Sequence, residues 1–144
     1  MVRDNTRSVL HGMQVVLPQF KARKQGVLVN VSSMLSRMPL VSFRAAYSAS
    51  KAAMNALTEA ARAELASEFP GIRVVLVLPG VVATEFGNNA VGGGPDSRSL
   101  PGAQPVDEVA RVIADGLFAG PLDLYTRAEY FGRVLAHLRG LAGV

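Results

Sequence analysis

The hydrophobic positions of this chain fall into two kinds of segment that follow one another in a regular order. Residues 5–24 carry apolar side chains at steps of three and four, which predicts an amphipathic helix. A second, longer helix is predicted for residues 45–69, which are rich in alanine. Residues 27–31 and 72–78 are short, continuous apolar runs, typical of parallel strands that are buried on both faces. This alternation predicts an α/β fold with a parallel sheet.

The last third of the chain continues the pattern. Residues 106–118 predict an amphipathic helix, residues 122–126 a short strand, and residues 127–139 a final helix. The apolar face of that final helix consists of Phe131, Val134, Leu135 and Leu138. Residues 85–104 are instead rich in Gly, Asn, Ser and Pro, which indicates either a mobile flap over a substrate or a segment without function.

Composition narrows the classes of function. The chain has 144 residues, of which 49% are hydrophobic, and it has no cysteine and only two histidines, so we expect one domain and no metal site. The net charge of +4 comes from scattered residues, and its one tight cluster falls where a helix end favours cations, so no nucleic-acid partner is expected. We find neither an apolar run of membrane-spanning length nor a signal-peptide core, and therefore expect a cytoplasmic protein.

The candidate chemistry lies at the start of the second predicted helix. Tyr47 and Lys51 are four residues apart, so their side chains share one helix face. A phenol has a pKa of about 10, and a neighbouring cation lowers the pKa by favouring the phenolate. Ser33 follows the first predicted strand, where its hydroxyl can hold a substrate oxygen against the phenol. The spacing alone does not distinguish this pair from a surface tyrosine that stacks on the stem of a lysine.

Three segments together carry a resemblance to a known family. They are residues 26–33 (GVLVNVSS), residues 47–53 (YSASKAA) and residues 72–84 (IRVVLVLPGVVAT). In this order and at nearly this spacing they resemble the catalytic half of the short-chain dehydrogenase/reductase family, over about residues 5–126. The resemblance implies a partial Rossmann-like, doubly wound parallel sheet. It also implies an oxidoreductase that uses NAD or NADP to interconvert a carbonyl and an alcohol.

The resemblance assigns roles to four catalytic residues. Tyr47 is implied as the acid or base, Ser33 as the group that holds the substrate oxygen, and Lys51 as the cation that lowers the pKa of Tyr47 and binds the nicotinamide ribose. Asn5 is implied to anchor, through its backbone, a water that links Lys51 to solvent. The other interpretation of Asn5 is a simple helix N-cap.

The same resemblance implies a cofactor turn and a substrate loop. Pro79, Gly80, Val82 and Thr84 are implied to support the cofactor, the backbone of Val82 binding the carboxamide and Thr84 a phosphate. The loop of residues 34–44 is implied to line the substrate pocket. Its apolar members are Met34, Leu40 and Phe43, residue types that anchor loops to a core just as often.

The chain departs from the family pattern in three respects. Ser8 stands where glycine is more frequent, and Ser33 precedes Tyr47 by 14 residues instead of about 13, which keeps Ser32 and Ser36 open as alternatives. The Gly-rich turn that binds the pyrophosphate is also missing, so we expect residues 1–144 to form a single, incomplete domain.

Two hypotheses for function follow. The first is an NAD(P)-dependent oxidoreductase with Tyr-Lys-Ser chemistry and a small carbonyl or alcohol substrate, assembled as a homo-oligomer through the two long helices. The second is an inactive remnant that acts as a self-association module. With half of the cofactor site missing, we expect weak cofactor binding or none in the isolated chain, with self-association or the need for a complementary fragment. Neither the substrate, the reaction direction nor the choice of NAD or NADP can be predicted from these residues.

Overall fold

The computed structural model of the protein describes residues 2–90 and 93–144. Four helices and three strands form its framework, and short 3-10 turns join some of them. In chain order the elements are α1 (Val2–Arg23), β1 (Gly26–Val31), η1 (Met34–Ser36), η2 (Ser42–Arg44), α2 (Ala45–Leu65), β2 (Ile72–Leu78), η3 (Ser97–Ser99), α3 (Val106–Gly116), β3 (Asp123–Tyr125) and α4 (Ala128–Ala142). The predicted α/β class is confirmed.

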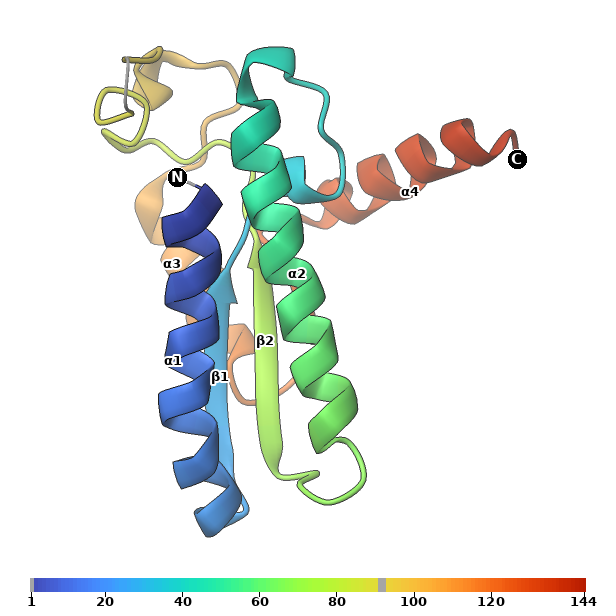
Figure 1. Cartoon of the computed structure of the whole chain (residues 1–144). Helices are drawn as coiled ribbons and strands as arrows, with labels where there is room; N and C mark the ends of the chain where they lie inside the picture. Colours follow the sequence, from blue (N-terminus) through green and yellow to red (C-terminus); the bar gives the residue numbers. More distant parts are fainter. Residues whose placement is uncertain (1, 91–92) are drawn as a thin grey trace.

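The three strands form one parallel sheet in the order β1-β2-β3. Helices α1 and α2 lie side by side over one face of β1 and β2, and α3 lies behind the sheet (Figure 1). The side chains of β2 alternate accordingly: Val74 packs with Leu65 on the α1/α2 side, whereas Val75 and Val77 pack toward Val112 of α3. A strand with helices on both faces needs a continuous apolar run, which explains the sequence of β2.

The two predicted central strands differ in burial. The side chains of Val75, Leu76, Val77 and Leu78 are 0% exposed. The prediction that β1 is a central strand is wrong, because β1 is an edge strand that pairs with β2 alone among the described residues. Most of β1 is therefore only half-buried, and Val31 at its end is 47% exposed. Its side chains do pack on both faces, Leu28 toward Leu65 and Val29 toward Val112.

Several element ends differ from the predictions. Helix α1 begins at Val2, so Asn5 lies inside the helix and the interpretation of Asn5 as an N-cap is wrong. Helix α2 ends at Leu65 and not near residue 69, and a turn follows in which the Phe69 N–H still donates to the Leu65 carbonyl at 2.9 Å. Helix α4 continues to Ala142, where Gly143 ends it in the left-handed conformation (φ 73°), and it projects away from the sheet (Figure 1).

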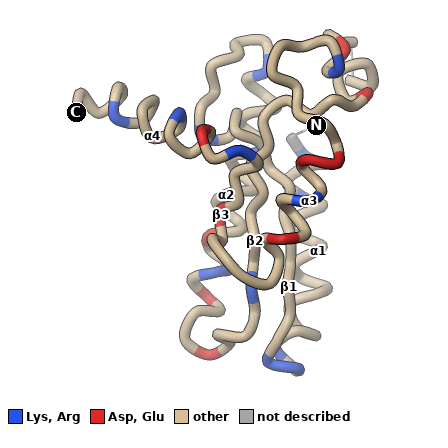
Figure 2. Tube along the Cα trace, turned by 180° about the vertical axis from the view of Figure 1, so that it is seen from behind, with Lys and Arg blue, Asp and Glu red and all other residues tan. Residues whose placement is uncertain are grey.

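Basic and acidic residues are mixed along the described part of the chain. Figure 2 shows basic and acidic positions interspersed along the trace, with the basic last turn of α1 at one end of the molecule. Within the described part of the chain, no helix combines the length and the hydropathy needed to cross a bilayer.

Candidate active site

The predicted site residues gather where the strands end. Ser33 follows β1, and the turn of residues 79–84 follows β2. Because the two strands are parallel, both segments lie at the same edge of the sheet. Tyr47 lies in the first turn of α2, and the chain between β1 and α2 forms the short turns η1 and η2. The topology thus brings Ser33, Tyr47 and Lys51 to one edge.

The phenol of Tyr47 is half-buried in a partly apolar surrounding. Its ring lies 5.8 Å from the ring of Phe86, centroid to centroid, at an angle of 59°. Burial raises the pKa of Tyr47, while the Ser33 hydroxyl and the charge of Arg44 act in the opposite direction. The net direction is the reverse of the lowering that was expected, because desolvation of the phenolate outweighs both neighbours. Tyr47 is therefore a neutral phenol near pH 7.

Lys51 is held at the end of β1. Its Nζ donates to the Val31 carbonyl at 2.8 Å and lies 5.8 Å from the centroid of the Tyr47 ring. Burial lowers the pKa of Lys51, because desolvation disfavours the ammonium. The structure thus places Lys51 beside Tyr47, as the helix spacing predicts, but the hydrogen bond of its ammonium goes to the backbone.

The three serines near the end of β1 have different surroundings. Ser32 Oγ donates to Asn55 Oδ1 at 2.6 Å, and Ser36 Oγ donates to the Ser33 carbonyl at 2.5 Å. Both protons are therefore used inside the protein. Ser33 Oγ accepts the Leu35 N–H at 3.2 Å, which leaves its own proton for another acceptor, and its hydroxyl acts on Tyr47. Of the three candidates, Ser33 is the one whose proton is not used in these bonds, and its role at the substrate oxygen stays a prediction.

Asn5 approaches α2 through its side chain. Asn5 Nδ2 donates to Ser50 Oγ at 3.0 Å, and Ser50 Oγ donates in turn to the Tyr47 carbonyl at 2.7 Å. The Asn5 carbonyl accepts the Ser8 hydroxyl at 3.2 Å, so the serine that departs from the family pattern takes up one of its two lone pairs. The role of this carbonyl in a water relay stays a prediction.

Pro79 and Gly80 serve the packing of the turn. The Pro79 carbonyl accepts the Met34 N–H at 2.9 Å, which ties the turn to the loop after β1. A Cβ placed on Gly80 would lie 2.6 Å from Tyr130 Oη, so the ring of Tyr130 in α4 would have to shift to admit a side chain there. The support of the cofactor by Pro79 and Gly80 stays a prediction.

The backbone N–H and C=O of Val82 point away from Gln104. Gln104 bonds to the residues on either side of Val82: its N–H donates to the Val81 carbonyl and its carbonyl accepts the Ala83 N–H, both at 2.8 Å. In such a parallel bridge the N–H and C=O of the middle residue point to the opposite side. The Thr84 N–H donates to the Val82 carbonyl at 2.8 Å, and Thr84 Oγ1 accepts the Phe86 N–H at 3.3 Å.

The predicted substrate loop divides into a core part and a rim. Met34 is 5% exposed and packs with Met38, Tyr130 and Val134, which supports the alternative interpretation of Met34 as a residue that anchors the loop to a core. Leu40 and Phe43 are exposed on the rim. The predicted flap of residues 85–104 includes residues 91 and 92, which lie outside the described part, while its end is fixed by the fully buried Gln104.

Two residues near the site were missed from the sequence. Phe86 contacts the Tyr47 ring although it is 54% exposed, and no local pattern marks it. Asn55 is 3% exposed and bonds to Ser32 and Ser36. An asparagine one turn after Lys51, within an alanine-rich helix, was a signal that could have been noticed.

Comparisons with known proteins agree with this geometry. The family model for short chain dehydrogenase matches residues 1–92. The "Dehydrogenase/reductase SDR family protein 7-like" of Anopheles gambiae is 36% identical over 103 residues, which are 67% of this chain and 32% of that protein. The "Dehydrogenase/reductase SDR family member 7B" of Danio rerio is 37% identical over 106 residues, which are 69% of this chain and 33% of that protein.

Solved structures show the same fold. A short chain dehydrogenase from Burkholderia cenocepacia J2315, solved in complex with NADP, gives a TM-score of 0.75 at 33% identity and covers 98% of this chain and 54% of its own. A short-chain dehydrogenase from Sphingobium yanoikuyae, solved with NADPH, gives a TM-score of 0.69 at 28% identity. The match covers 96% of this chain and 53% of that protein. The chain therefore spans about a third of the curated relatives it matches and about half of these structures. The predicted resemblance is confirmed: the chain belongs to the short chain dehydrogenase family.

Proposed function

We propose that this chain is the catalytic part of an NAD(P)-dependent oxidoreductase in which Tyr47 protonates the oxygen of a carbonyl substrate. The observation that carries the proposal is the pairing of a neutral, half-buried phenol with the Ser33 hydroxyl at the carboxyl edge of the sheet. A phenol that keeps its proton near pH 7 suits the role of general acid, so the proposal is a reduction of carbonyl to alcohol.

The proposed role of each residue follows from the proton that its side chain can donate. One of the two lone pairs of the Ser33 hydroxyl accepts the Leu35 N–H, and the hydroxyl can donate its proton to a substrate oxygen. Tyr47 then transfers its own proton to the same oxygen as negative charge develops there. The Lys51 ammonium, next to the Tyr47 ring, stabilises the phenolate that remains. Phe86, Leu40 and Phe43 offer apolar contact to a substrate with a hydrophobic body.

The described residues also fit a nicotinamide cofactor. A bound nicotinamide supplies the hydride for the carbonyl carbon. In this chain, the Val82 N–H points away from its own bridge partner and is suited to a carboxamide oxygen. Thr84 and the ammonium of Lys51 are the further candidates for polar contacts to the cofactor. The neighbours solved with NADP and NADPH support NADP, and NAD stays an alternative.

The proposal is tested by cofactor binding and turnover in parallel. Titration calorimetry of the 144-residue chain with NADPH and NADH measures binding, and NADPH absorbance with a panel of aryl and alkyl ketones measures reduction. We expect Tyr47→Phe to lower kcat by about 100-fold or more while the chain stays folded, since general acids contribute that much. Tyr125→Phe is the matched control, because Tyr125 is a half-buried tyrosine in β3 with a raised pKa of its own.

Two results would refute the proposal. Turnover that survives Tyr47→Phe would remove Tyr47 from the chemistry. A folded chain that binds neither cofactor, alone or with a fragment that supplies the other half of the fold, would remove the oxidoreductase activity itself.

A second candidate function is self-association, and one observation favours it. Helices α1 and α2 line a groove of about 440 Å³. Most of its residues are apolar, among them Leu10, Leu17 and Leu57, and its polar residues are Gln14, Lys21 and Glu64. An apolar groove between two helices is suited to helices of a second copy. Sedimentation equilibrium of the chain and of Leu57→Glu separates the two cases: a dimer that Leu57→Glu converts to a monomer supports association, and a monomeric parent chain excludes it.

A further inference from the structure

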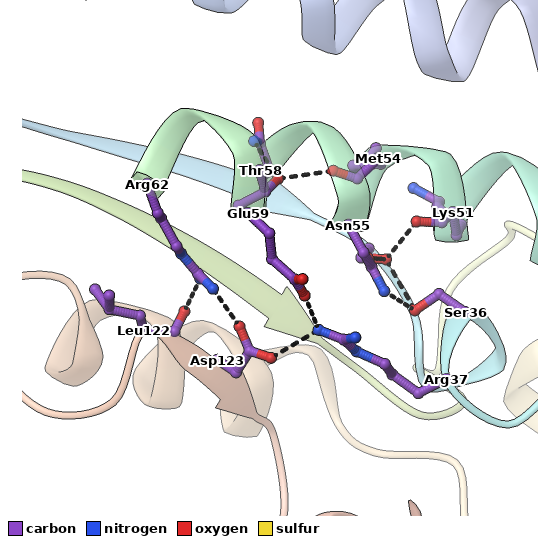
Figure 3. Close-up of polar contacts among 12 residues, drawn as sticks. Ser36, Arg37, Lys51, Met54, Asn55, Thr58, Glu59, Arg62, Leu122 and Asp123 are labelled. Atoms are coloured by element: carbon purple, nitrogen blue, oxygen red, sulfur yellow. Dashed lines mark hydrogen bonds and ion pairs between the residues drawn. The ribbon is translucent and has the colours of Figure 1, made fainter. Parts of the chain in front are cut away.

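A buried amide on α2 connects that helix to the segment that carries Ser33. Asn55 lies one turn after Lys51 and is only 3% exposed. Its Oδ1 accepts the Ser32 hydroxyl at 2.6 Å, and its Nδ2 donates to Ser36 Oγ at 2.7 Å. Figure 3 shows the Asn55 side chain reaching from α2 to Ser36. A single side chain thus bonds to residues on both sides of Ser33.

The direction of these bonds follows from the number of protons. Ser32 Oγ has one proton, and Asn55 Oδ1 at 2.6 Å is a nearer acceptor than Ser36 Oγ at 3.2 Å or the Lys51 carbonyl at 3.3 Å. Ser36 Oγ also has one proton, which it donates to the Ser33 carbonyl at 2.5 Å. Ser36 Oγ is therefore an acceptor toward Asn55, and the Asn55 amide donates to one of its two lone pairs.

The result is a relay from α2 to the backbone of Ser33. The amide of Asn55 fixes the Ser36 hydroxyl, and the Ser36 hydroxyl fixes the Ser33 carbonyl. Because Tyr47 is on the same helix as Asn55, this relay sets where the Ser33 hydroxyl lies relative to the phenol. A second tie, the ion pair of Arg37 with Glu59, holds the same loop to α2 but does not bond to Ser33 (Figure 3).

We infer that Asn55 is a positioning residue that holds Ser33 against Tyr47 through Ser32 and Ser36. The inference rests on the proposed function, because it assigns Asn55 a role in the Ser33–Tyr47 pair. Asn55 does not itself act on the substrate. Removing its amide releases the Ser33 hydroxyl from the phenol, and the phenol then loses a neighbour that favours the phenolate.

The test is a double-mutant cycle read by the titration of Tyr47. Tyrosinate absorbance against pH is measured for the 144-residue chain, and subtraction of the Tyr47→Phe curve in each background isolates Tyr47 from the other two tyrosines. The variants are Ser33→Ala, Asn55→Leu, which keeps the size of the side chain, and the double variant. Thr58→Val is the matched control: Thr58 lies on the same helix, is fully buried, and bonds to Asn30 and to the Met54 carbonyl.

We expect Asn55→Leu to raise the pKa of Tyr47 by the same amount as Ser33→Ala, with no further rise in the double variant, because both changes remove one contact. Thr58→Val should leave the Tyr47 titration unchanged. If Asn55→Leu does not fold, as judged by circular dichroism, Ser36→Ala removes the relay with the loss of one hydroxyl and carries the same expectation.

Three outcomes overturn the inference: a Tyr47 pKa that does not respond to Ser33→Ala, one that does not respond to the relay variants, and additive shifts in the cycle. None of these requires turnover. A failure here is therefore distinct from a failure of the proposed function, which is decided by the kcat of Tyr47→Phe.

Discussion

The carboxylate of Asp123 joins three parts of the fold, and its removal should measurably destabilise the protein. Asp123 in β3 accepts from Arg62 of α2 at 2.7 Å and from Arg37 of the loop after β1 at 3.0 Å (Figure 3). Arg62 also donates to the Leu122 carbonyl at 2.7 Å, and Arg37 is paired with Glu59. Asp123→Ala therefore removes two charged hydrogen bonds but leaves both arginines with other acceptors.

The magnitude follows from burial. The side chains are 18% exposed for Arg62, 29% for Arg37 and 31% for Asp123, so the site lies between the surface and the core. Exposed ion pairs contribute less than about 1 kcal/mol to the free energy of unfolding, and breaking a buried ion pair lowers it by about 3–5 kcal/mol. Since Arg37 keeps Glu59 as its ion-pair partner and Arg62 keeps the Val74 and Leu122 carbonyls as acceptors, we expect Asp123→Ala to lower the free energy of unfolding by about 2 kcal/mol.

Urea denaturation followed by circular dichroism measures this change. Asp115→Ala is the control, because Asp115 is an exposed aspartate on α3, and it should change the free energy of unfolding by less than about 0.5 kcal/mol. Asp123→Asn keeps an acceptor without the charge and should fall between the parent chain and Asp123→Ala. A loss for Asp123→Ala no larger than that of the control would refute the reasoning, since it would mean that desolvation cancels both contacts.

Two further changes test the turn after β2 and the burial of Lys51. Gly80→Ala should destabilise the chain by about 1–3 kcal/mol through overpacking against the ring of Tyr130, and an unchanged denaturation midpoint would show that the ring moves aside. Lys51 has a lowered pKa in the folded state, so the unfolded state binds its proton more tightly. The free energy of unfolding should therefore rise as the pH rises from the folded pKa toward 10.5. The free energy of unfolding is measured against pH for the parent chain and for Lys51→Met, below pH 10 and so before Tyr47 titrates. We expect the rise in the parent chain only. Equal slopes of the free energy against pH in the two proteins would contradict the burial of Lys51 as its cause.

The sequence alone determined the elements and the family. The run of residues 72–78 and the alternation of helices with strands are local patterns of apolar side chains, and the structure confirms the parallel sheet. Tyr47 and Lys51 share a helix face because of helix geometry, which is also local. The three segments that carry the family resemblance could be found without coordinates for the same reason.

Only the tertiary structure decided what surrounds these residues. Burial, which depends on β1, the loop after it and Phe86 together, reversed the expected direction of the Tyr47 pKa. The bonds that use the hydroxyl protons of Ser32 and Ser36 form only in the folded chain, and the acceptor of Ser32, Asn55, is more than 18 residues away in the sequence. Glycine at position 80 is explained by a ring from α4, and β1 is an edge strand because of its pairing.

The physical reason for this division is the range of the forces. Backbone propensity and side-chain periodicity act between neighbours along the chain, so they can be recognised in the sequence. Desolvation, the sharing of a hydroxyl proton and steric contact act between atoms that folding brings together, and their balance depends on distances of a few tenths of an ångström. In this protein the residues of the site were encoded locally, while their protonation and their partners were set by the fold.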